Sequence, residues 1–182
     1  MPAEDTNAAS SEEAASQALI TPPSPIPAEL RAMASREREK PFGPRHIWYT
    51  VYVPGEGWVF PARDGQSANG DDPHSRIEAV EVMVVGTPWF WLRAHMESHG
   101  WQDWVQAAEG EFIEVGEPGK SLRLEALSVA VADGEICADA RVQTMDGWQG
   151  WRCSRDGPNG IVTVGTTGHS LRMEALRLTV GA

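Results

Sequence analysis

The sequence GWQGW at residues 147–151 recurs upstream as GWQDW at residues 100–104, and its first two residues recur again as GW at residues 57–58. The three Gly-Trp pairs are separated by 43 and 47 residues. A period of this length is typical of repeat proteins in which each copy is one supersecondary unit. The motif therefore predicts three copies of one structural unit.

A second motif, of the form Arg-x-Glu-Ala, follows each Gly-Trp pair. Its copies are RIEAV at 76–80, RLEAL at 123–127 and RMEAL at 172–176, which lie 47 and 49 residues apart. In the second and third copies a glycine-rich loop precedes the arginine, GEPG at 116–119 and GTTG at 165–168. Two independent motifs that recur three times in the same order indicate an internal repeat.

The residues around these motifs have the composition of β-strands. WYTVYV at 48–53 is aromatic and β-branched, as strands prefer. Another strand is expected to begin at the arginine of each second motif and to end at the valine eight residues later. Its apolar residues alternate in one phase over 171–175 and in the opposite phase over 176–180, which indicates a β-bulge or burial on both faces.

Units of this size cannot each bury a hydrophobic core, so the three copies are expected to pool their apolar faces. We therefore expect an all-β, pseudo-threefold repeat domain over residues 46–182, with a β-prism-like arrangement and a β-trefoil as the alternative. The repeats are expected at about 46–86, 87–133 and 134–182.

Residues 1–45 differ sharply in composition from the rest of the chain. They are rich in Ala, Ser, Glu and Pro, and none of the eight tryptophans lies among them. Such a segment buries too little apolar surface to offset its ordering entropy, so a disordered tail is expected, with one short helix over 29–39. The tail serves either as a linker or as a peptide that docks on a partner.

Charge and hydropathy exclude several classes of partner. The net charge of −11 argues against nucleic acid and against anionic membranes. No run of about 20 apolar residues is present, so no transmembrane segment is expected. The N-terminus lacks a basic segment followed by an apolar core, which indicates a cytoplasmic protein or one exported without a cleaved signal.

The two cysteines lie at equal distances from Met145. A hairpin that turns there would bring Cys137 and Cys153 opposite each other. A disulfide in an oxidising compartment and two free thiols in a reduced protein both fit this spacing.

The Gly-Trp-x-x-Trp segment, the GTTG loop and the Arg-x-Glu-Ala motif resemble the clostridial hydrophobic repeat with a conserved tryptophan, the ChW repeat. The third copy is the best match, whereas the first has Pro61 in place of its second tryptophan. The resemblance implies secreted or surface proteins of clostridia and streptomycetes that bind polysaccharide or protein. It implies no catalytic residue, and it favours an extracellular or cell-surface location.

Paired tryptophans suit carbohydrate, because sugars stack their C–H faces on flat aromatic rings. The candidate ligand-binding residues are Trp101, Gln102, Asp103, Trp104, Trp148, Gln149 and Trp151. The competing interpretation is that the tryptophans are core residues. Since positions i and i+3 of a strand face opposite ways, one tryptophan of each pair is expected in the core and the other closer to solvent.

The remaining polar motifs are expected to have structural roles and to take no part in catalysis or metal binding. The arginine and glutamate of each second motif, such as Arg172 and Glu174, share one face of a strand and are expected to pair. His95 and His99 lack the His-Glu-x-x-His pattern, so no metal is expected. No cofactor or catalytic residue is expected either. The sequence thus predicts a non-catalytic, lectin-like binding module, with a structural or adaptor protein as the alternative.

Overall fold

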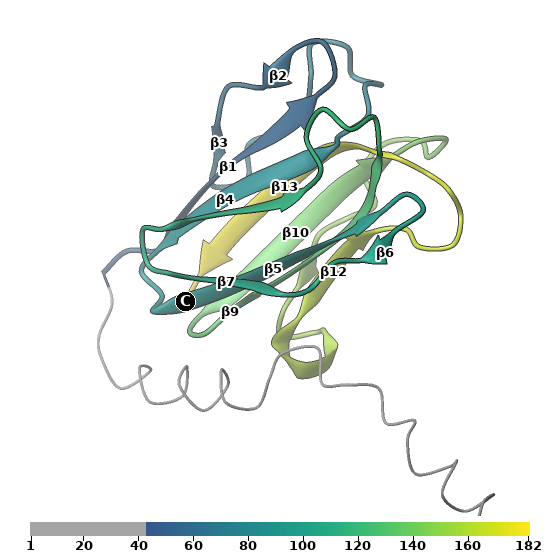
Figure 1. Cartoon of the computed structure of the whole chain (residues 1–182). Helices are drawn as coiled ribbons and strands as arrows, with labels where there is room; N and C mark the ends of the chain where they lie inside the picture. Colours follow the sequence, from purple (N-terminus) through teal and green to yellow (C-terminus); the bar gives the residue numbers. More distant parts are fainter. Residues whose placement is uncertain (1–42) are drawn as a thin grey trace, which may run out of the picture.

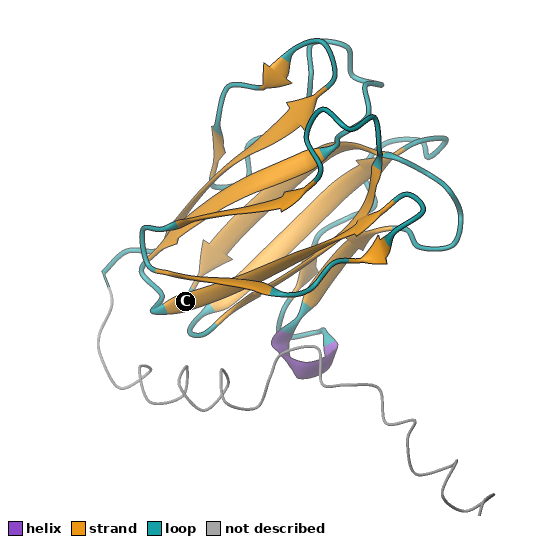
Figure 2. Cartoon of the chain, in the orientation of Figure 1, coloured by secondary structure: helices purple, strands orange, loops and turns teal. Residues whose placement is uncertain are grey.

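The computed structural model describes residues 43–182, so the predicted tail and its helix over 29–39 lie outside the described residues, apart from residues 43–45. The described part is built of strands (Figure 2), with one 3₁₀ turn, η1, at Pro158–Gly160. The all-β prediction is confirmed. No helix within residues 43–182 is long and apolar enough to cross a membrane.

The strands are grouped by the three predicted repeats, and their positions are shown in Figure 1. The first repeat holds β1 (His46–Val53), β2 (Gly57–Trp58), β3 (Ala62–Arg63) and β4 (Ala79–Val85). The second holds β5 (Trp89–Met96), β6 (Gly100–Trp101), β7 (Val105–Ala108), β8 (Phe112–Gly116) and β9 (Leu124–Val131). The third holds β10 (Glu135–Val142), β11 (Arg152–Cys153), β12 (Val162–Gly165) and β13 (Met173–Gly181).

Each of the three sheets is built on one long antiparallel pair from a single repeat: β1 with β4, β5 with β9, and β10 with β13. A strand from the next repeat extends two of these sheets, since β8 pairs with β4 and β12 pairs with β9. The third sheet is extended by the first repeat, because Ala68 pairs with Leu176 of β13 in an isolated bridge. The three repeats therefore close on one another by exchanging backbone hydrogen bonds.

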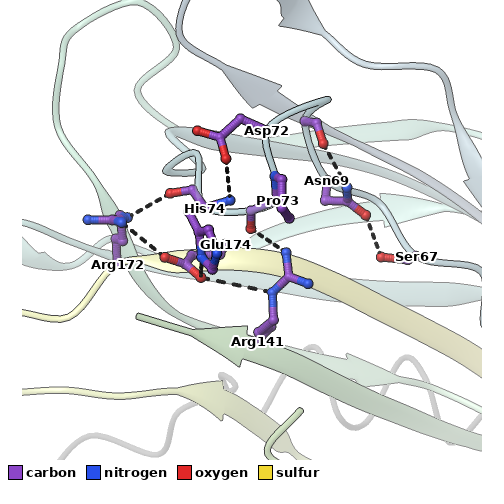
Figure 3. A network of polar contacts seen from close by, with 9 residues as sticks. Ser67, Asn69, Asp72, Pro73, His74, Arg141, Arg172 and Glu174 are labelled. Atoms are coloured by element: carbon purple, nitrogen blue, oxygen red, sulfur yellow. Dashed lines mark hydrogen bonds and ion pairs between the residues drawn. The ribbon is translucent and has the colours of Figure 1, made fainter. Parts of the chain in front are cut away.

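Polar contacts reinforce the junction between the first and third repeats (Figure 3). Arg172 donates from Nε to the carbonyl oxygen of His74, and Arg141 donates to the carbonyl oxygen of Pro73. Within the first repeat, the hydroxyl of Tyr49 donates to the carbonyl oxygen of Gln66. Burial raises the pKa of Tyr49 to about 12, so this hydroxyl stays protonated at ordinary pH.

The inner faces of all three sheets supply one hydrophobic core. Its fully buried members include Tyr49 from the first sheet, Phe90 and Leu92 from the second, and Ile136 and Leu176 from the third. Pooling of apolar faces, which the sequence predicts, is what makes repeats of this size stable. The choice between prism and trefoil stays a prediction.

In the second and third repeats the phase change in the last strand is a β-bulge. The pairing register shifts opposite Glu125, between His95 and Met96, and opposite Glu174, between Arg141 and Val142. The strands themselves begin one to three residues after the arginine of the motif. The glutamates are nearly fully buried, and each pairs with the arginine two residues earlier, at 2.9–3.0 Å. The predicted pairing is confirmed, and it keeps a buried carboxylate compensated.

The cysteines are joined. Cys137 lies opposite Cys153 in the register of β10 with β11, and the two sulfur atoms form a disulfide. Of the two alternatives that the sequence leaves open, the structure has the disulfide. It links the first strand of the third repeat to the segment that follows its second tryptophan.

Reduction of this bond is expected to lower the free energy of unfolding by about 3 kcal/mol, because closing a loop of this size restricts the unfolded chain. Urea unfolding with and without reductant measures the difference, and a mass shift of about two hydrogens verifies reduction. The double variant Cys137→Ala, Cys153→Ala serves as control, because its stability must not respond to reductant. Equal midpoints for oxidised and reduced wild-type protein would contradict the prediction.

Candidate functional site

The motif tryptophans lie on the outer faces of the sheets, away from the central core. In β5 the side chains of Phe90, Leu92, Ala94 and Met96 belong to the core. Because side chains alternate along a strand, Trp91, Arg93 and His95 face outward. Trp101 in β6 pairs with His95, and their rings meet edge to face at 5.2 Å.

The prediction that one tryptophan of each pair is a core residue does not hold for the central core, although Trp104 packs against a second buried cluster formed by Trp91, Ala130, Ala132 and Ile161. Trp101, Trp104 and Trp148 are half-buried, Trp151 is 43% exposed, and none of them belongs to the central core. The rule for positions i and i+3 requires an unbroken strand. Here β6 ends at Trp101 and β7 begins only at Val105, so both rings return to the same outer face.

In the second repeat the two tryptophans bracket an arginine. The guanidinium carbon of Arg93 lies 4.4 Å from the ring centroid of Trp101 and 4.8 Å from that of Trp104. Both distances are within the range of cation–π attraction. Burial lowers the pKa of Arg93, although the group stays charged. No carboxylate among residues 43–182 pairs with it.

The third repeat builds the same stack with the arginine on the opposite strand. Arg177 lies 3.9 Å from the ring centroid of Trp148 and 5.1 Å from that of Trp151. Its cross-strand neighbour Asp139 is fully buried and accepts a hydrogen bond from it. The corresponding cross-strand pair in the second repeat is Arg93 with Ser128. The arginine therefore lies on the first long strand of the second repeat and on the last strand of the third.

The first repeat lacks such a stack. Its corresponding cross-strand pair is Thr50 with Glu81, and Pro61 stands where the second tryptophan would be. Trp58 instead meets Tyr52 edge to face, with ring centroids 5.6 Å apart. Only the second and third repeats therefore carry the paired aromatic arrangement.

The two motif glutamines are held by backbone groups. Gln102 accepts a hydrogen bond from Gly116 N at 2.9 Å and donates to Gly116 O at 3.4 Å. Gln149 makes the same two bonds with Gly165, at 2.8 and 3.1 Å. The sequence assigned both glutamines to ligand binding, but their amides anchor the glycine loop to the tryptophan motif. We therefore leave them out of the proposed ligand set.

A pocket of about 480 Å³ lies beside Trp151. It is lined by Arg93 from the second repeat and by residues of the third, including Arg152, Asn159 and Thr163. The pocket thus joins one stacked arginine to the exposed tryptophan of the other stack. Sequence reasoning missed Arg93 and Arg152. The signal available was Arg93 itself, a charged residue within the apolar, aromatic run WFWLRA at 89–94.

Asp103, His95 and His99 do not line this pocket. Asp103 is exposed and makes no hydrogen bond or ion pair with another described residue. His95 pairs with Glu125 at 3.1 Å, and His99 pairs separately with Glu117 at 2.6 Å. Within residues 43–182 one group of three potential metal ligands occurs, at Glu135, Cys137 and Cys153, and its two sulfur atoms are bonded to each other.

Comparison with known proteins identifies the repeat. A family model described as "Clostridial hydrophobic W", or ChW, matches residues 95–133 and 146–180. These segments lie in the second and third repeats and contain both Trp-x-x-Trp motifs. Searches of curated proteins and of solved structures found no match.

Proposed function

The chain carries two ChW repeats, and on this premise we propose that its β domain is a non-catalytic, lectin-like module for a carbohydrate or cell-envelope polymer. The observation that carries the proposal is the position of the tryptophan pairs. They stack on arginine outside the central core, and Trp151 remains 43% exposed beside a pocket. An exposed aromatic ring beside a pocket offers a flat apolar surface on which a sugar can stack.

The lining of the pocket supports binding in preference to catalysis. Trp151 offers a stacking surface, while Arg93, Asn159 and Thr163 offer charge and hydrogen bonds. Cys153 also lines the pocket, but its sulfur is held in the disulfide and cannot act as a thiolate nucleophile. The groups present are those that orient a ligand.

The disulfide also supports a ligand outside the cell. Disulfides persist in oxidising environments and are rare in the reducing cytosol. The Cys137–Cys153 bond lies beside the proposed pocket and would hold its wall in place on a cell surface.

Trp151→Ala is expected to weaken binding of the full chain to its best saccharide on a panel of glycans and cell-wall polymers. Loss of one stacking surface costs on the order of 1–2 kcal/mol, which is about tenfold or more in affinity. Phe60→Ala is the matched control, since Phe60 is a solvent-exposed ring that lies outside this pocket. Circular dichroism verifies that both variants fold. Unchanged binding by folded Trp151→Ala protein would contradict the proposal.

A second candidate, a structural or adaptor protein, is favoured by Phe60. This side chain is 93% exposed and borders a groove of about 960 Å³ in the first repeat, which also contains Pro61 and Glu56. Phenylalanine is among the residue types enriched in protein–protein interfaces. Two results together would favour this candidate. The wild-type protein would bind no member of the glycan panel, and it would bind a protein partner that the Phe60→Ala variant does not bind.

A further inference from the structure

Two arginines of the described chain lack the carboxylate partner that the others have. Among the ten arginines of residues 43–182, eight form an ion pair with aspartate or glutamate. The exceptions are Arg93 and Arg152, and both line the pocket beside Trp151. In a chain with 26 acidic residues and 15 basic ones, two unpaired cations in one pocket call for a functional reason.

Arg93 carries an energetic cost for its position. It is half-buried, and its Nε atom is inaccessible to solvent and makes no hydrogen bond. Desolvation is the cause of its lowered pKa, and the groups that stabilise its charge are the rings of Trp101 and Trp104 in place of a carboxylate. The equivalent stack of the third repeat has its own acid, Asp139, to compensate Arg177. The second repeat has none.

Arg152 completes the positive character of the pocket. It is exposed, and one nitrogen of its guanidinium, Nη1, donates to the carbonyl oxygen of Thr163 at 3.1 Å. That bond orients the group and leaves its other donors free. One carboxylate, Asp156, also lines the pocket, but its side chain is 75% exposed and lies 3.9 Å from Arg155. It therefore opposes the two arginines only weakly.

We propose that this pocket, between the second and third repeats, binds an anionic saccharide. The anionic group of the sugar, a carboxylate or a sulfate, would accept hydrogen bonds from Arg93 and Arg152. The sugar ring would stack on Trp151, and Asn159 is placed to contact a hydroxyl. Guanidinium groups match planar and tetrahedral oxyanions through paired donors, and a stacked guanidinium is already oriented for them. This inference rests on the proposed function and names the class of its ligand.

The test compares charged and neutral forms of one sugar chain on the full-length protein. The probes are an oligogalacturonide, its fully methyl-esterified form, and a sulfated galactose oligomer of the same length. The variants are Arg93→Gln and Arg152→Gln. Arg63→Gln is the control, because Arg63 also lies over a tryptophan, Trp48, at 5.6 Å, but outside the pocket. Calorimetry at low and high salt measures the affinities.

We expect the wild-type protein to bind an anionic probe, the ester at least about tenfold more weakly, and added salt to weaken binding. Each pocket variant should lose about tenfold or more, and Arg63→Gln should lose nothing. Arg152 is exposed, so its variant tests the proposal even if Arg93→Gln folds poorly. The two anionic probes distinguish carboxylate from sulfate. Equal affinity for the ester and no effect of either variant would overturn this inference while leaving a neutral-sugar lectin. Failure to bind any saccharide, neutral or anionic, would overturn the proposed function as well.

Discussion

Asp139→Ala is expected to lower the free energy of unfolding by about 3–5 kcal/mol, which is the usual cost of breaking a buried ion pair. Asp139 is fully buried, and its two oxygens accept from Arg177 and from Gly150 N. Without it, Arg177 loses its compensating charge between Trp148 and Trp151. Urea unfolding followed by tryptophan fluorescence measures the loss.

Asp103→Ala is the matched control for this variant. Asp103 belongs to the corresponding motif of the second repeat, is exposed and makes no contact of this kind with a described residue. Its removal is expected to change the free energy of unfolding by less than about 0.5 kcal/mol. A similar, small change for both variants would show that Asp139 does not hold the third stack together.

Gly165→Ala is expected to cost about 2–5 kcal/mol, from a strained backbone and from a collision between repeats. Gly165 ends β12 with a φ of +90°, and a Cβ atom there would lie 2.7 Å from Cα of Ala126 and would also meet the carbonyl oxygen of Glu125. Both neighbours are backbone atoms of the second repeat. The glycine is thus required where one repeat adds its strand to the sheet of another.

Gly147→Ala separates the two contributions. Gly147 has a similar φ of +95°, but an added Cβ would meet nothing within 4 Å. It should show the strain alone, about 1–2 kcal/mol. If both alanine variants are equally stable by urea unfolding, the close contact between β12 and β9 is not present in solution.

Much of the fold follows from the sequence. Recurring motifs predicted an all-β repeat domain, the phase change over 171–180 indicated a bulge or burial on both faces, and a hairpin that turns at Met145 would place the cysteines opposite each other. These features depend on short-range geometry, namely side-chain alternation and hairpin symmetry. The pairing of Arg172 with Glu174 is of the same kind, because the two residues lie two positions apart in the sequence.

Other features could not be read from local patterns. Strands β8 and β12 each pair with a strand of the preceding repeat. The alternation of apolar and polar residues predicts a strand but does not show which other strand it pairs with. The burial of the tryptophans was misjudged because the strand between Trp101 and Trp104 is interrupted. The glutamines looked available for a ligand, and only the position of Gly116 and Gly165 shows that their amides are engaged.

The pocket illustrates the same limit of local patterns. It combines Arg93 from β5 with Arg152 from β11, which are 59 residues apart in the sequence and belong to different repeats. The informative signal is the charge at corresponding positions of the repeats. The third repeat has an acid, Asp139, with an arginine opposite, whereas the second has Arg93 with Ser128 opposite. Such an exchange is recognisable only once the strand register is known.

The central claim, that the outer-face tryptophans contact a saccharide, is tested most directly by NMR of the tryptophan indole groups. Each indole N–H gives a separate signal, and titration with the saccharide that binds best should shift those of Trp151, which lines the pocket, and Trp104, which stacks on the pocket residue Arg93. The signals of Trp48 and Trp58, on the first sheet, should stay in place. Shifts confined to Trp48 and Trp58, or no shift at a saturating concentration of a bound saccharide, would contradict the account.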